Sequence, residues 1–161
     1  NIQNLKSKCG ADTIVDVQHH QIYQWAAKST DLGTKGICDV FDAEGSVRLC
    51  LFGHRHIHQR SLPLVYEGKG KATTKEKAEY AADTKGTIYM QSPSMWYQFT
   101  EPLDNELVAN NGKPSFKGSY TGYGEMTITP EALVSETYVY EGTGKARHDR
   151  IDQFKILRPK A

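Results

Sequence analysis

The chain has 161 residues, a length that suits one domain with a hydrophobic core, and 38% of its residues are hydrophobic and 24% charged. Its 20 basic and 19 acidic residues give a formal net charge of +1. This balance argues against a dedicated nucleic-acid-binding protein, which would carry a basic stripe. The sequence shows no signal peptide and no apolar run long enough to span a membrane.

The first sixty residues have the pattern strand, helix, strand. The chain begins at Asn1 rather than Met, and residues 2–8 resemble the end of a helix, so we expect a mature, trimmed or fragmentary chain. The β-branched alternation of residues 13–17 predicts a strand, and residues 37–43 have helical spacing with Gly45 as a C-terminal stop. Residues 47–52, which are apolar apart from Arg48, predict the next strand.

Histidines follow both of these strands. His19 and His20 come directly after the first, and His54, His56 and His58 come after the second at every other position. A right-handed crossover makes the two strands parallel and brings their carboxyl ends to one edge of a sheet. Neutral imidazole is a common metal ligand, so the pattern predicts a metal site at this edge. The alternative is that these side chains cap strands or lie in solvent.

After residue 60 the composition changes. Residues 62–66 predict a strand, and residues 67–83, rich in Lys, Thr, Ala and Gly, predict an exposed insertion with some helix over 75–82. Residues 86–90 predict another strand. Trp96, Tyr97 and Phe99 lie in a long loop, where packing is a commoner use for such side chains than lining a substrate cleft.

The end of the chain predicts an antiparallel meander. Its expected strands are residues 124–129, 133–140 and 152–157, with turns at Pro130-Glu131 and over residues 142–144. We therefore divide the chain into residues 1–60, which carry the histidines, an insertion over 61–85, and a β-rich closing segment over 86–161.

The three cysteines indicate little about function. Cys9, Cys38 and Cys50 are widely spaced and form no Cys-x-x-Cys motif of a zinc or redox site. At least one thiol is expected to be free, and Cys50 lies in an apolar run that predicts core packing. The cysteines therefore do not indicate in which cellular compartment the protein lies.

Four segments resemble one known family. His19-His20-Gln21-Ile22-Tyr23 resembles the His-His-Pro-x-Tyr element of the calcineurin-like metallophosphoesterases, in particular the purple acid phosphatase branch. Residues 53–60, Gly-His-Arg-His-Ile-His-Gln-Arg, resemble the Gly-His-x-His-x-Tyr-x-Arg element of that branch. Residues 86–89 are similar to its Gly-Thr-x-Tyr strand, and residues 124–157 to its closing hairpin and final strand.

The resemblance implies an α/β fold, namely the second half of a four-layer α/β/β/α sandwich that becomes β-rich towards the C-terminus. It also implies hydrolysis of a phosphoester by a metal-activated hydroxide at a site with two divalent or trivalent ions (Fe, Zn or Mn). His19 and His54 would bind one ion, His56 would bind the other, and His20 would be the catalytic residue near the substrate phosphate.

Two arginines accompany the second histidine group, one between His54 and His56 and one after His58. Arg55 and Arg60 could each bind a phosphate through two hydrogen bonds, which makes them candidate substrate-binding residues. For Arg60, a salt bridge to a neighbouring loop is an equally good prediction.

The sequence departs from the family pattern in three ways. Gln21 replaces a proline, His58 stands where a tyrosine is usual, and the motifs of the family's first half, which supply its aspartate and asparagine ligands, are absent. Hard cations favour carboxylate oxygens. The nearest acids in the sequence are Asp12, Asp16, Asp39 and Asp42, and none is a convincing substitute.

These observations leave three interpretations. In the first, the chain is the C-terminal part of a secreted or cell-surface metallophosphoesterase and shares its metal ions with an N-terminal part, present as a separate or cleaved chain. In the second, it is a degenerate, non-catalytic structural or assembly module. In the third, it is a small hydrolase with one metal ion on a three-histidine site, which predicts tight zinc binding by the chain alone.

Overall fold

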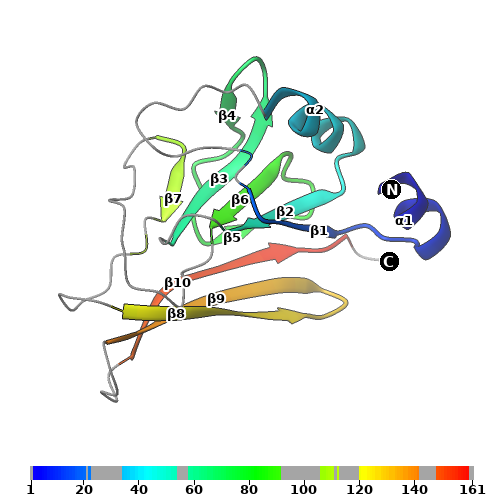
Figure 1. The fold of residues 1–161 in the computed structure, drawn as a ribbon. Helices are drawn as coiled ribbons and strands as arrows, with labels where there is room; N and C mark the ends of the chain where they lie inside the picture. The colour runs from blue at the N-terminus through cyan, green and yellow to red at the C-terminus, as the bar shows by residue number, and fades with distance from the viewer. Residues whose placement is uncertain are drawn as a thin grey trace.

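The computed structural model describes residues 2–20, 22, 34–53, 58–91, 106–110, 112, 120–141 and 148–159 (Figure 1). The helices are α1 (Ile2–Cys9) and α2 (Thr34–Glu44). The strands are β1 (Ile14–Gln18), β2 (Val47–Phe52), β3 (Gln59–Tyr66), β4 (Gly70–Ala72), β5 (Glu79–Tyr80), β6 (Thr87–Gln91), β7 (Val108–Asn110), β8 (Tyr120–Ile128), β9 (Ala132–Glu141) and β10 (His148–Leu157).

The predicted strand–helix–strand unit is formed by β1, α2 and β2. The two strands pair in parallel, with Gln18 opposite Phe52 at their carboxyl ends. Helix α2 ends where the sequence predicts, because Gly45 adopts a φ of 64° and its N–H donates to the carbonyl of Phe41 at 2.9 Å. The carboxyl ends of β1 and β2 therefore meet at one edge of a sheet.

The first sheet has the strand order β1-β2-β6-β3-β4, and β7 also pairs with β3. Strands β1, β2 and β6 run parallel, whereas β3 runs antiparallel to β6. Both of its faces are buried. The face covered by α2 contributes Cys50, Phe52 and Tyr89, among others, to one apolar cluster.

The second sheet has the order β5-β10-β9-β8, and its last three strands form the predicted antiparallel meander. The turn between β8 and β9 lies at the predicted place, and Thr129 N–H donates to the carbonyl of Ala132 at 2.8 Å. The turn predicted over residues 142–144 lies outside the described residues.

The predicted helix over residues 75–82 is wrong. This stretch contains the short strand β5, which pairs in parallel with β10, and Lys155 N–H donates to the carbonyl of Ala78 at 2.8 Å. The Lys, Ala and Glu residues favour helix, but strand pairing and the burial of Tyr80, which is 1% exposed, override that preference. The segment is therefore not wholly an exposed insertion.

The two sheets lie one against the other, with α2 over the outer face of the first (Figure 1). Between them lies a second apolar cluster that includes Leu49 and Ile88 of the first sheet and Phe154 and Ile156 of the second. Burying each such side chain contributes roughly 1.5–3 kcal/mol. The described helices include none long and apolar enough to cross a membrane.

Candidate functional site

One row of paired residues marks the edge of the first sheet at which β1, β2 and β6 end. Gln18 is paired with Phe52, Phe52 with Gln91, and Gln91 with Gln59 at the start of β3. The next residue outward is His19 after β1, Gly53 after β2 and His58 before β3. Three strands of the first sheet thus bring His19 and His58, one member of each histidine group, to the same edge.

The first histidine group lies beside the end of β2. Gly53 N–H donates to the carbonyl of His19 at 3.2 Å, and a Cβ added to Gly53 would lie 3.8 Å from Nδ1 of His19. The rings of His19 and His20 are exposed, with centroids 4.9 Å apart and an edge-to-face angle of 73°. The predicted meeting of the strand ends is confirmed. His54, Arg55 and His56 lie outside the described residues, so their part in the site stays a prediction.

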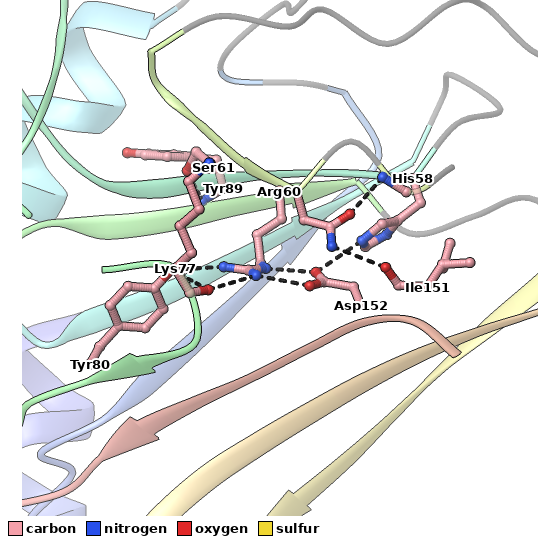
Figure 2. Close-up of polar contacts among 10 residues, drawn as sticks. His58, Arg60, Ser61, Lys77, Tyr80, Tyr89, Ile151 and Asp152 are labelled. Carbon is pink, nitrogen blue, oxygen red and sulfur yellow. Dashed lines mark hydrogen bonds and ion pairs between the residues drawn. The ribbon is translucent and has the colours of Figure 1, made fainter. Parts of the chain in front are cut away.

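A buried ionic cluster lies at the same edge, where β3 faces β10 (Figure 2). Asp152 Oδ2 accepts hydrogen bonds from Arg60 Nε at 2.6 Å and from His58 Nε2 at 3.0 Å, and Oδ1 accepts one from Arg60 Nη2 at 2.8 Å. All three side chains are nearly excluded from solvent. Asp152 therefore ties the start of β3 in the first sheet to the second sheet.

The carboxylate of Asp152 is held in its charged form. Burial would raise its pKa, but the hydrogen bonds from Arg60 and His58 outweigh burial and lower the pKa to about 2. Burial likewise acts to lower the pKa of Arg60, and Asp152 reverses this effect, so the Arg60 pKa is raised. The pair is thus an ion pair at any ordinary pH.

Arg60 has further partners within the chain. Nη1 donates to the Tyr80 hydroxyl at 2.7 Å, Nη2 donates to the carbonyl of Lys77 at 2.9 Å, and Cζ lies 4.4 Å from the ring centroid of Phe154. Arg60 is 1% exposed. Of the two uses that the sequence left open, the structure shows a salt bridge, although its partner is a strand residue of the second sheet and not a loop.

His58 has only one hydrogen-bonded ring nitrogen in the part of the chain that the structure describes. Its Nε2 binds Asp152, whereas Nδ1 is buried and has no hydrogen-bond partner among the described residues. Gly112 packs against this side chain with a φ of 57°, and a Cβ there would lie 2.7 Å from the Cβ and Cδ2 atoms of His58. Only glycine therefore allows this close approach.

Three of the four acids nearest the histidines in sequence have other partners. Asp12 binds Arg158 at 3.1 Å, Asp16 Oδ2 lies 3.4 Å from Cys50 Sγ, and Asp42 Oδ2 accepts from the N–H of Tyr66 at 2.6 Å. Within the described ranges, no group of three or more His, Cys, Asp or Glu side chains is arranged to hold a metal ion.

Sequence reasoning missed Asp152, although a signal for it was present. In strand β10, Asp152 shares a face with Phe154 and Ile156, and both of these are core residues. A carboxylate at a core-facing position needs a buried partner, because an unpaired charge is costly there. Arg60, which follows an apolar strand, could therefore have been predicted as the buried partner of Asp152.

Two facing sheets with a helix on the outer face of the first confirm the predicted α/β fold class, and this arrangement is consistent with the C-terminal part of a metallophosphoesterase fold. The structure of a purple acid phosphatase from seeds of yellow lupin (Lupinus luteus) matches 91% of this chain with a TM-score of 0.66 and 19% sequence identity. The match covers 25% of the lupin protein. No family model and no curated protein matches the sequence. The likeness establishes the fold.

Proposed function

We propose that this chain is part of a metal-dependent phosphoester hydrolase of the acid phosphatase type and supplies the histidine side of a site for two metal ions. The observation that carries the proposal is the meeting of the β1 and β2 ends, where His19 lies directly beside Gly53. The residue after Gly53 opens the second histidine group of the sequence.

Each histidine of the site has a proposed role. His19 and His54 would hold one ion and His56 the other, with Fe, Zn or Mn as the candidate metals. The donor set fits Fe and Zn, because imidazole nitrogen suits both and His19 is exposed at the strand end, whereas Mn would depend more on carboxylate ligands from elsewhere. When bound, two cations would stabilise the charge on the attacking and leaving oxygens of the phosphoester.

The remaining groups would bind the substrate. His20 is exposed beside His19, so it can donate a hydrogen bond to a phosphate oxygen placed at this edge. Arg55 would do the same with two parallel hydrogen bonds. Arg60 instead has an indirect role. Its buried guanidinium binds Asp152 and so holds in place the strand that follows the second histidine group.

A complete site requires a further part of the protein. The chain spans about a quarter of the lupin phosphatase that it resembles. Two dications also need carboxylate ligands, whereas Asp12, Asp16 and Asp42 are engaged elsewhere. We therefore propose an N-terminal part of the same domain, covalently continuous or separate, as the partner that supplies them.

The engaged acids also favour a second candidate function. A chain that keeps the fold and the histidines without carboxylates at the same edge would serve as a non-catalytic structural or assembly module. The two candidates differ in metal content, because the module needs no ion for its role.

The deciding experiment is intact mass and metal content measured on the same native sample. A second polypeptide with about two metal ions per complex supports the hydrolase, and His54→Ala should then remove metal and phosphatase activity together. The matched control is His148→Ala, which removes an exposed imidazole at the start of β10. A lone 18.1 kDa species without metal would contradict the enzymatic proposal and favour the module.

A further inference from the structure

We infer that His58 is a further metal ligand of this edge, that it binds a divalent transition-metal ion through Nδ1, and that Asp152 is the positioning residue that orients it. This inference rests on the proposed function, which assigns ions to the other histidines and leaves His58 without a role. It begins from the Nδ1 atom of His58, which is buried and has no hydrogen-bond partner among the described residues.

The proton position in His58 follows from its partner. Arg60 donates a hydrogen bond to each of the two carboxylate oxygens of Asp152, so these oxygens act as acceptors towards their neighbours. The contact of 3.0 Å therefore requires a proton on Nε2 of His58. In the neutral ring Nδ1 then carries a lone pair, and this is the form in which imidazole binds a metal.

The cluster reproduces the way in which proteins hold metal-binding histidines. Such a histidine usually donates its other ring N–H to a carboxylate or a carbonyl, which sets the ring orientation and raises its basicity as a ligand. Asp152 provides this contact, and Arg60 balances the carboxylate charge through Nε and Nη2. A buried acceptor without a hydrogen-bond partner is destabilising, so a purely structural role does not account for Nδ1.

The place of His58 in the sheet also fits. The row of paired residues from Gln18 to Gln59 puts His58 at the same edge as His19, one residue beyond the row in both cases. Three strand spacings separate the two backbones, roughly 14 Å. This separation suits opposite sides of a two-ion site better than a single ion held by both imidazoles.

The test is a long-range proton–nitrogen correlation spectrum of the ¹⁵N-labelled protein, with any polypeptide that co-purifies, during titration with Zn²⁺ alone. His58→Gln identifies the His58 signals by their loss. We expect the Nε2-protonated form before Zn²⁺ is added. We then expect a large shift of the Nδ1 resonance on titration, while Nε2 keeps its proton.

Affinity provides the second readout. Competition with a chelating dye should show that Zn²⁺ binds His58→Gln at least about tenfold more weakly than the wild type. His148→Gln, the matched control for loss of an imidazole, should leave the affinity unchanged. If His58→Gln does not fold, the shift of the Nδ1 resonance in the wild-type spectrum decides whether His58 binds the ion.

The outcomes separate this inference from the proposed function. If the His19 ring responds to Zn²⁺ and the His58 ring does not, the inference is overturned and the proposed function stands. If the His58 ring responds and the His19 ring does not, the inference stands and the proposed ligand set is wrong. A spectrum in which no imidazole responds overturns both. A proton on Nδ1 of His58 overturns this inference and leaves the proposed function standing.

Discussion

Through its two carboxylate oxygens, Asp152 accepts hydrogen bonds from Arg60 in the other sheet and from His58, which directly precedes that strand. Removing one member of a buried ion pair leaves the other charge without compensation, whereas an exposed pair contributes little. The two pairs on β10 allow a direct comparison, because Arg150 in the same strand binds Glu136 on the protein surface.

We predict that Asp152→Asn lowers the free energy of unfolding by roughly 3–5 kcal/mol, because it leaves the guanidinium of Arg60 buried and unpaired. Urea denaturation followed by circular dichroism measures the change. Glu136→Gln is the control and should leave the midpoint nearly unchanged. Equal effects of the two substitutions would show that the buried cluster has no special importance for stability.

The low pKa of Asp152 also predicts acid sensitivity. Its pKa is 3.8 in the unfolded chain and about 2 in the folded protein, so the unfolded state binds more protons between these values. The stabilisation is fully present above pH 3.8 and is lost as the pH falls through 2. It amounts to roughly 2 kcal/mol. Unfolding midpoints measured between pH 2 and 5 should show this loss of stability in the wild type. In Asp152→Asn the fall in stability over the same pH range should be smaller, because the contribution of the Asp152 carboxylate is absent.

At the scale of the elements, the approach of β6 to β3 depends on one glycine. Gly86 precedes β6 with a φ of 92°, and a Cβ there would lie 2.6 Å from the carbonyl oxygen of Leu64 in β3. Gly68 also has a positive φ, 79°, but its Cβ would meet nothing within 4 Å. The two positions therefore separate backbone strain from steric clash.

We predict that Gly68→Ala costs about 1–2 kcal/mol, from the positive φ alone. Gly86→Ala should cost roughly 1–3 kcal/mol more, because the backbone of Leu64 has to move to admit the added methyl group. Thermal and urea unfolding of both variants measure the difference. A Gly86→Ala variant as stable as Gly68→Ala would mean that β3 and β6 can separate without loss.

At the scale of the whole molecule, β1 stands at the end of the first sheet. Edge strands expose unpaired backbone groups that can pair with another chain. Val17, in this strand, is 73% exposed, which is unusual for a strand valine. This is the edge at which an added strand would extend the sheet.

We therefore predict that the isolated chain associates as its concentration rises, and that Val17→Lys reduces the association without lowering the melting temperature. Sedimentation velocity over a range of concentrations provides the measurement. Val40→Lys is the matched control, since Val40 is 49% exposed but lies on α2. If both variants reduce association equally, general hydrophobicity and not the edge of β1 is responsible.

The sequence by itself determined the elements whose patterns are local. The β-branched alternation of β1, the glycine stop of α2 and the apolar run of β2 each reflect short-range chemistry, so the strand–helix–strand unit and the meeting of its strand ends could be predicted. The last three strands were predictable for the same reason, because alternating side chains and turn residues act within a few positions.

Only the tertiary structure decided the features that join distant segments. Residues 75–82 favour helix locally, yet pairing with β10 makes Glu79–Tyr80 a strand. Arg60 and Asp152 lie 92 positions apart, so no local pattern shows that they form the buried ion pair that holds His58. The physical reason is that a buried charge is stabilised by whatever the fold brings beside it, and the fold alone determines that neighbour.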